Sequence, residues 1–280
     1  MPDPDRLLQT LAHAAEAFRA TPGRRGRIVA LDGADEVLVA GDLHGHVGNF
    51  RKLLAAADLG RRPRRHLVLQ EVIHTRAESA VRDTSHQLVD LLAALVCQHP
   101  GRVHFLIGNH ELAQATDRPI FKDDVTHNDL FWEGVWASYG DRAAEVYAAY
   151  LGLFGAAALA VRTPNRVFIS HSLPPAKWLE TFDPAALEHD PTDAAALAAG
   201  GSVYALLWGR DTSAEHVAAF LAKVDADLLI TGHIPCDKGF EVPNERQVIL
   251  DCMGEPACYC LLPADRPLAH DELVRCVHTL

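Results

Sequence analysis

Short apolar runs alternate with amphipathic stretches along the first hundred residues of this chain. Apolar side chains recur at helical spacing in three stretches, which predicts helices at residues 6–18, 50–60 and 85–97. Runs rich in Val, Leu and Ile, most of them bounded by turn-forming residues, predict strands at 27–31, 36–40, 66–69 and 103–107. This alternation of strands and helices indicates a mixed α/β fold.

The second half of the chain continues the pattern with one helical interruption. Residues from about 112 to 155 are rich in Ala and aromatic side chains, which predicts several helices with the aromatic rings in their core rather than on a base-stacking surface. The turn at 163–165 joins two apolar runs and predicts a hairpin. Further elements are a helix at 214–224 and strands at 227–231, 247–250 and 257–262. Because no repeat, flexible linker or low-complexity stretch divides the chain, we predict one domain over residues 1–280.

Five of the predicted strands end in side chains of the types that bind metal ions. Asp42 and His44 follow the strand at 36–40, and because they are two residues apart on an extended segment, their side chains point the same way. An oxygen and a nitrogen ligand together suit a borderline divalent cation. The other four strand ends carry Glu71, then Asn109 followed by His110, then His171, and finally His233. Ligands gathered at one edge of a sheet form a site, and the helices at 112–155 are predicted to pack over it.

Composition narrows the classes of function. The formal net charge is -11, which argues against general binding to nucleic acid or to an anionic membrane. No stretch approaches the ~20 apolar residues of a membrane span, and the acidic start at residues 1–5 does not look like a signal peptide, so a cytoplasmic location is the default expectation. Six cysteines are too few for a disulfide scaffold and are expected to be reduced and mostly buried.

The polar strand ends resemble the motifs of the calcineurin-like metallophosphoesterase superfamily. The matching segments, in order, are Gly41-Asp42-Leu43-His44-Gly45, Gly108-Asn109-His110-Glu111, Ser170-His171 and Gly232-His233. Leu207-Trp208-Gly209-Arg210-Asp211 resembles the arginine segment of the phosphoprotein-phosphatase branch. The resemblance covers about residues 36–251 and implies two stacked mixed β-sheets flanked by helices, an α/β (α+β) fold.

The resemblance also implies a centre with two divalent metal ions, of which manganese is the leading candidate, with iron, zinc or cobalt as alternatives. Asp42 and His44 would hold one ion, and Glu71 would bridge the pair. Asn109, His171 and His233 would hold the other ion. Two such ions share a water molecule, lower its pKa and aim the resulting hydroxide at phosphorus.

Two further residues are expected to act on the phosphate ester. His110 would protonate the leaving oxygen as general acid. Arg210 would bind the non-bridging phosphate oxygens, because a planar guanidinium matches phosphate well. A surface ion pair with Asp211 is the alternative role for Arg210.

The second motif of this superfamily, normally Gly-Asp-x-x-Asp-Arg-Gly, is altered here. Glu71 replaces the bridging Asp, and we expect it to bridge still. His74 replaces the Asp that would orient His110, and it is not expected to stabilise a protonated His110 because two imidazolium ions repel. Thr75 replaces the phosphate-binding Arg, with Arg76 one position later. His74 and Arg76 are therefore candidate phosphate contacts, and the alternative for His74 is an ordinary loop residue.

The leading hypothesis is a phosphomonoesterase whose partner is a phosphorylated substrate, either phosphoserine or phosphothreonine in a protein or a small phosphorylated metabolite. It rests on Trp208-Gly209-Arg210 and on Pro235, which stands where phosphodiesterases of the superfamily usually have a second histidine. One alternative is a nucleotide hydrolase acting on a dinucleoside polyphosphate or a cyclic phosphodiester. The other is a metal-binding pseudophosphatase that recognises phosphorylated partners without cleaving them, as the altered second motif allows.

Overall fold

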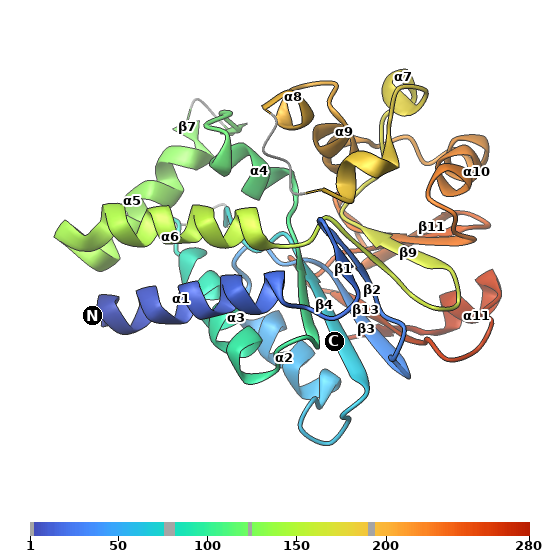
Figure 1. Cartoon of the computed structure of the whole chain (residues 1–280), viewed down its shortest axis with the longest axis horizontal. Coiled ribbons are helices and arrows are strands. Elements are labelled where there is room, and N and C mark those ends of the chain that lie inside the picture. Colours follow the sequence, from blue (N-terminus) through green and yellow to red (C-terminus); the bar gives the residue numbers. More distant parts are fainter. Residues whose placement is uncertain (1–2, 76–81, 123–124, 190–193) are drawn as a thin grey trace.

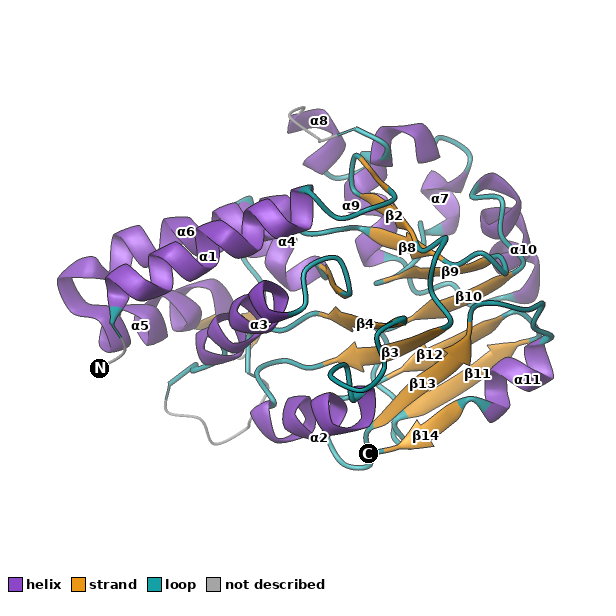
Figure 2. Ribbon diagram, turned by 60° about the horizontal axis from the view of Figure 1, so that its bottom comes forward, coloured by secondary structure: helices purple, strands orange, loops and turns teal. Residues whose placement is uncertain are grey.

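Two mixed β-sheets packed face to face form the centre of the molecule (Figures 1 and 2). The computed structural model describes residues 3–75, 82–122, 125–189 and 194–280. The smaller sheet has five strands, in the spatial order β14 (Val277–Thr279), β13 (Cys258–Pro263), β3 (Glu36–Asp42), β4 (Arg65–Gln70) and β5 (Val103–Leu106). Its strands β3, β4 and β5 are parallel neighbours, so their carboxyl ends lie at the same edge.

The larger sheet has seven strands. In spatial order they are β1 (Arg24–Arg25), β2 (Ile28–Ala30), β8 (Ala160–Arg162), β9 (Val167–Ser170), β10 (Leu228–Thr231), β12 (Gln247–Leu250) and β11 (Phe240–Asn244). Strands β8 and β9 form the predicted antiparallel hairpin, whereas β9, β10 and β12 are parallel. A separate short hairpin joins β6 (Phe121–Lys122) and β7 (Val125–Thr126).

The side chains of strand β3 point alternately to its two faces and show how the two sheets and the helices are held together. Val37 and Val39 are fully buried among Val161, Ile169 and other residues of the larger sheet. Leu38 and Ala40, which point to the opposite face, are fully buried in a second core under the helices. Because successive side chains of a strand point to opposite faces, a strand that is apolar throughout is covered on both sides. This arrangement confirms the predicted fold class of two stacked mixed sheets flanked by helices.

Helices from residues 4–156 cover the outer face of the smaller sheet and extend to one side of it (Figure 2). The three predicted from helical spacing are α1 (Pro4–Arg19), α2 (Val47–Ala57) and α3 (His86–Gln98). The aromatic and alanine-rich segment forms α4 (Asn109–Ala115), α5 (His127–Tyr139), the 3₁₀ turn η1 (Gly140–Arg142) and α6 (Ala143–Ala156). Their starts follow ordinary capping chemistry: the Asp3 side chain accepts backbone N–H bonds at the start of α1, and Thr126 does so for α5.

Shorter helices cover the larger sheet. They are α7 (Ala176–Leu179), η2 (Pro184–Leu187), α8 (Ala194–Leu197), α9 (Ser202–Trp208) and α10 (Ala214–Lys223). The helix α11 (His270–Arg275) instead places its buried Leu273 in the core between the two sheets. The sequence pattern predicts α10 but not α11, β11 or β14, which are short and partly exposed. The predicted strands at 27–31 and 36–40 correspond to β2 and β3, which belong to different sheets.

Two isolated bridges tie the carboxyl ends of the sheets together, between Asp42 and Asp251 and between Leu106 and Ala158. The ends of β3, β4 and β5 therefore face the ends of β9 and β10 at one edge of the sandwich. None of the described helices combines the length and the apolarity needed to cross a bilayer. All six cysteines are free thiols, and three of them are buried. The extent of the domain, 1–280, stays a prediction.

Candidate metal centre

The six predicted metal ligands come together where the two sheets meet. Asp42 ends β3 and His44 lies just after it, Glu71 follows β4, and Asn109 begins α4 after β5. The larger sheet supplies His171, directly after β9, and His233, two residues after β10. The exposed fraction of these six residues ranges from 0% to 6%, so all of them face a closed interior. The sequence pattern placed these ligands at one sheet edge, whereas the structure divides them between two sheets.

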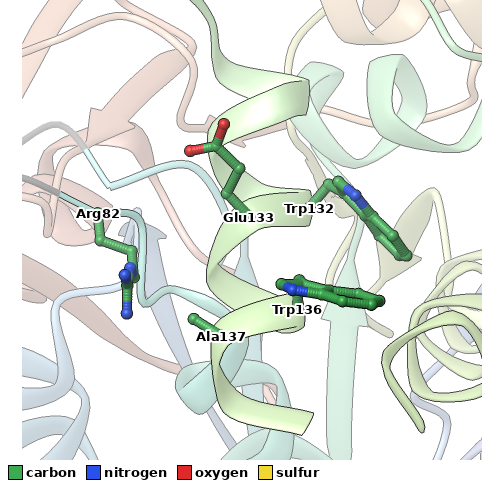
Figure 3. A pocket seen from close by; sticks show the side chains of 5 residues that line it. All are labelled: Arg82, Trp132, Glu133, Trp136 and Ala137. Atoms are coloured by element: carbon green, nitrogen blue, oxygen red, sulfur yellow. The ribbon is translucent and has the colours of Figure 1, made fainter. Parts of the chain in front are cut away.

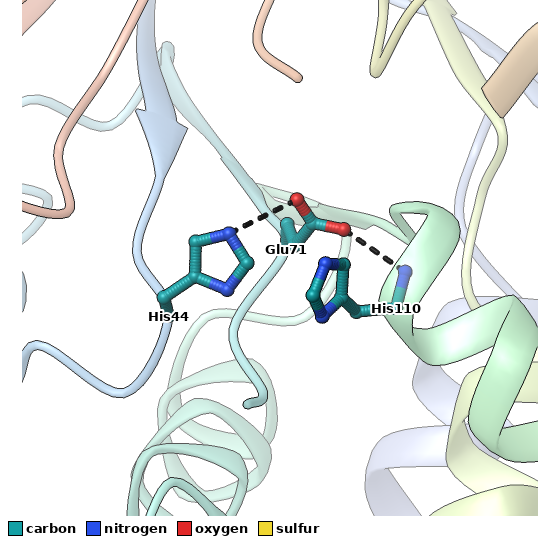
Figure 4. Close-up of side chains that lie close together, drawn as sticks. All are labelled: His44, Glu71 and His110. Atoms are coloured by element: carbon teal, nitrogen blue, oxygen red, sulfur yellow. Dashed lines mark hydrogen bonds and ion pairs between the residues drawn. The ribbon is translucent and has the colours of Figure 1, made fainter. Parts of the chain in front are cut away.

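Glu71 lies at the centre of this group. Its Oε2 is 3.3 Å from His44 Nε2 (Figure 4) and 3.5 Å from His171 Nε2, so it contacts one residue from each of the two predicted sets of ligands. Its Oε1 accepts the backbone N–H of His110 at 3.0 Å. The carboxylate therefore stands where a bridging ligand would have to be.

The other predicted ligands contact one another on the His171 side of Glu71. His171 Nε2 is 3.0 Å from Asn109 Oδ1 and 3.2 Å from His233 Nδ1. His171 Nδ1 is 3.6 Å from Asp42 Oδ1, while Asp42 Oδ2 accepts the backbone N–H of His233 at 2.8 Å. This last bond links the ends of the two sheets directly through a predicted ligand.

Unusual backbone angles aim these side chains. His44, Glu71, His74 and His233 have φ values of 42°, 39°, 64° and 67°, in the left-handed region that costs a non-glycine residue about 1–3 kcal/mol. The loop glycines make room: a Cβ on Gly108 would lie 2.3 Å from Glu71 Oε1, and one on Gly232 would lie 2.1 Å from Asp42 Oδ1. Strain and glycines concentrated at one place indicate a site that the rest of the fold holds in position.

The donor set fits divalent cations. Asp42 Oδ1 and His171 Nδ1 are buried and have no hydrogen-bond partner among the described residues. His44 Nδ1 lies 2.9 Å from the carbonyl oxygen of Ile73 and donates to it, which leaves Nε2, 3.3 Å from Glu71 Oε2, as the nitrogen that could bind a cation. Burial, followed by the charge of Glu71, raises the pKa of Asp42 well above its ordinary value, which a bound cation would reverse.

Two overlapping groups show where cations would fit. Ligand atoms of Asp42, Glu71 and His171 all lie within 4.8 Å of one another, and so do those of His44, Glu71 and His110. Glu71 belongs to both groups. His110, which the resemblance makes an acid rather than a ligand, therefore lies at the edge of the same cluster of side chains.

We expect divalent metal to stabilise the folded protein. A cation that binds only the native state at 100 times its Kd adds about 2.7 kcal/mol to the free energy of unfolding. For a domain of this size that is a rise in Tm of roughly 5–10 °C. Thermal unfolding in EDTA and in Mn²⁺, Zn²⁺ or Co²⁺ measures this shift. His44→Ala should reduce it, and an equal shift in that variant would contradict binding at this centre.

Arg210 reaches the centre from the end of α9. Its Nε donates to His233 Nε2 at 3.2 Å, and the side chain is otherwise exposed. Asp211, the alternative partner, accepts the backbone N–H of Ser213 at 3.0 Å. Arg210 therefore lies beside a predicted ligand with its guanidinium at the entrance. Arg76, the other predicted arginine contact, lies outside the described residues.

His74 differs most from the expectation. Its exposed fraction is 0%, its Nδ1 is 2.8 Å from His110 Nδ1, and its Nε2 is 2.8 Å from Gln114 Oε1. These bonds favour a role in positioning His110 over the predicted contact with phosphate or an ordinary loop position.

Sequence reasoning missed the carboxylates that hold the altered second motif. Glu111 Oε1 accepts the N–H groups of Val72 and Ile73, and Oε2 accepts that of Gly108. Burial, and then the charge of Glu71, raises the pKa of Glu111 to about 7. Its position three residues after Gly108, at the start of a helix, is the capping-box signal that could have indicated this role. Asp83 accepts the N–H groups of Thr75 and Ser85, and no sequence signal marks it.

Two other residues near the motifs have turn functions. Asp251 accepts the N–H groups of Cys236 and Met253, as expected for a turn aspartate. His46 caps α2 by accepting the N–H of Asn49 at 3.0 Å.

Most of the predicted aromatic core is buried, including Phe131, Tyr150 and Phe154. Trp136 is an exception with an exposed fraction of 53%. It lies beside Trp132 on α5 and helps to line a pocket of about 520 Å³ (Figure 3). The other lining residues are Arg82, Glu133 and Ala137, so this pocket contains none of the predicted metal ligands.

Comparisons with known proteins agree with this architecture. A family model described as calcineurin-like phosphoesterase matches residues 36–237. A probable serine/threonine-protein phosphatase of Encephalitozoon cuniculi is 24% identical over 239 residues, which cover 79% of this chain and 47% of that protein. This chain therefore spans about half the length of that curated relative.

Solved structures show the same fold at low identity. A protein serine/threonine phosphatase from Saccharomyces cerevisiae superposes with a TM-score of 0.70 at 14% identity, covering 100% of this chain and 90% of that one. A cold-active protein-tyrosine phosphatase from Shewanella gives a TM-score of 0.62 at 14% identity, with coverage of 95% and 84%.

Proposed function

The chain belongs to the calcineurin-like phosphoesterase family, and on this basis we propose that it is a metal-dependent phosphomonoesterase. The proposed substrates are phosphorylated Ser or Thr in a protein, or a small phosphorylated metabolite. Its relatives in the comparisons carry the names of protein phosphatases, which supports this class of substrate.

The proposal depends mainly on one observation. The side chains of six predicted ligands from two sheets converge in a nearly closed space, with the Glu71 carboxylate at their centre. Buried polar atoms are rarely left without a hydrogen-bond partner, as Asp42 Oδ1 and His171 Nδ1 are here among the described residues. We propose that two divalent ions, with manganese the first candidate, occupy this space and that Glu71 bridges them.

When bound, such ions would supply positive charge for the phosphate and a water of lowered pKa as nucleophile. The residues of the chain have separate tasks. His110 stands at the edge of the same cluster of side chains and donates a proton to the leaving oxygen, so that no free alkoxide has to depart. Arg210 is held by His233 and binds the non-bridging phosphate oxygens from the entrance. Burial of the centre excludes bulk water, which strengthens each of these electrostatic contacts.

Turnover of a substrate panel tests the proposal. The panel contains p-nitrophenyl phosphate, a phosphoserine peptide, bis-p-nitrophenyl phosphate and a dinucleoside polyphosphate, each with Mn²⁺ or with EDTA. We expect hydrolysis of the monoesters in Mn²⁺ and its loss in EDTA. Faster cleavage of the diester or of the nucleotide would identify a nucleotide hydrolase instead. Binding of metal and phosphopeptide without release of phosphate from any compound would identify a pseudophosphatase.

A further inference from the structure

A chain of hydrogen bonds behind His110 leads away from the metal centre into the helical layer. From His110 it passes through His74 to Gln114, with both links at 2.8 Å. Gln114 Nε2 then donates to Tyr147 Oη at 2.6 Å and to the backbone carbonyl of Asn128 at 3.4 Å. These residues come from the loop after β4 and from α4, α5 and α6, and all except Tyr147 are buried.

The carbonyl of Asn128 fixes the direction of the proton at Gln114. A carbonyl oxygen only accepts hydrogen bonds, so the amino group of the Gln114 amide has to face it. The amide oxygen then faces His74, and because this oxygen also only accepts, His74 Nε2 carries a proton. The opposite amide orientation would set two oxygens against each other.

The contact between the two histidines has room for one proton. If both Nδ1 atoms carried hydrogen at a separation of 2.8 Å, the two hydrogens would collide. Burial holds the pKa of His74 down at about 4, so His74 is neutral near pH 7 and its Nδ1 is an acceptor. His110 therefore donates from Nδ1.

Other contacts keep the His74 ring in this orientation. Its backbone N–H donates to Ser85 Oγ at 3.0 Å. The ring stacks on His127 with centroids 5.4 Å apart and meets the ring of Phe131 edge-on at 6.0 Å. The acceptor nitrogen thus remains directed at His110.

We propose that His74 and Gln114 are positioning residues that hold His110 in the tautomer protonated at Nδ1, so that Nε2 exchanges the proton with the substrate oxygen. This inference rests on the proposed function of His110. Figure 4 shows one ring nitrogen of His110 turned toward Glu71 and the other turned away. Since Nδ1 bonds to His74, Nε2 is the nitrogen on the side of the metal centre.

The replacement of Asp by His at position 74 makes Gln114 necessary. A carboxylate accepts a hydrogen bond from His110 in any state near pH 7, so it needs no partner to set its protons. A neutral imidazole has two tautomers, of which only one accepts at Nδ1. Gln114 selects that tautomer, and the pair together takes the place of one aspartate.

Long-range ¹H–¹⁵N correlation spectra of the zinc-loaded protein at a fixed neutral pH test the tautomers directly. We expect His110 protonated at Nδ1 and His74 protonated at Nε2 in the wild type. In Gln114→Met, which keeps the length of the side chain and loses the acceptor, His74 should show both tautomers. A wild-type His110 protonated at Nε2 would overturn the proposal, whether or not the protein hydrolyses any ester.

Kinetics of a double-mutant cycle give an independent result. Gln114→Met should lower kcat about 10–100-fold with little change in KM, as losses of outer orienting groups typically do. In a His74→Asp background the same substitution should have almost no effect, and His74→Asp should retain far more activity than His74→Phe. A purely structural role predicts equal losses from Gln114→Met in both backgrounds, which would contradict the inference.

Two outcomes separate this inference from the proposed function. If the wild type hydrolyses none of the panel compounds, the proposed function fails while the spectra still decide the tautomers. If it is active and Gln114→Met is as active as wild type, only the positioning role fails. His86→Gln, which alters a buried histidine that contacts Ser138 on α5, serves as the folding control.

Discussion

Replacing His110 with glutamine is expected to lower kcat about 10²–10⁴-fold, with little change in KM. Glutamine fits the same space and keeps the backbone N–H that Glu71 accepts, so the metal ligands should stay in place. What it lacks is an ionisable proton for the leaving oxygen.

The size of this loss should depend on the leaving group. p-Nitrophenolate departs readily without a proton, so its phosphate ester should lose least, whereas phenyl phosphate and a phosphoserine peptide should lose most. Steady-state rates on the three esters, with His86→Gln as the matched control, measure the difference. An equal loss on all three esters would show that His110 acts on binding or structure rather than as the acid.

Replacing Glu71 with glutamine is expected to lower the metal content and to reduce kcat/KM at least about 10³-fold. The carboxylate lies 3.3 Å from His44 Nε2 and 3.5 Å from His171 Nε2, so the same Oε2 atom is in reach of both sets of predicted ligands. A bound metal ion contributes several kcal/mol to transition-state stabilisation, and each 1.36 kcal/mol is a factor of ten in rate. Metal analysis after dialysis, together with rates at saturating Mn²⁺, gives both quantities.

Asp90→Asn is the matched control for this substitution. It makes the same change from carboxylate to amide at another mostly buried acid, which accepts bonds from the hydroxyl groups of Tyr139 and Tyr150 in the helical layer. This control should lose stability and keep its metal. Full metal content and activity in Glu71→Gln would mean that the ions, if present, do not share this carboxylate.

The altered second motif is accommodated by neighbouring parts of the fold. The longer Glu71 side chain lies against Gly108, where a Cβ would come within 2.3 Å of its Oε1. Glu111 fixes the two residues that follow Glu71 by accepting their N–H groups. Asp83 and Ser85 hold the next two through the backbone of Thr75 and His74. The departures from the family pattern therefore come with supporting contacts, which favours an altered site over a degraded one.

Several features followed from the sequence alone. The spacing of apolar residues predicted β3, β4, β5, β9 and β10 and the main helices. This works because burial of one or both faces of an element determines which of its positions are apolar. The polar residue after each of these strands also stands out against the apolar run before it. The six predicted ligands were therefore named from the chain itself, and the structure brings these six side chains together where the two sheets meet.

Other features were decided only by the tertiary structure. The sequence of a strand that is apolar on both faces does not show which strand it pairs with. The hydrophobic pattern therefore could not predict that the six residues are divided between two sheets. The acceptor role of His74 depends on Gln114, which is 40 residues away in the chain and near only after α4 packs against the loop that follows β4. Glu111 and Asp83 support the site by accepting backbone N–H groups. Almost every residue type has such a group, so the sequence does not show which residues make these bonds. Contacts of this kind form only when the chain is folded. The separation of two residues along the sequence does not determine whether a donor of one will lie near an acceptor of the other.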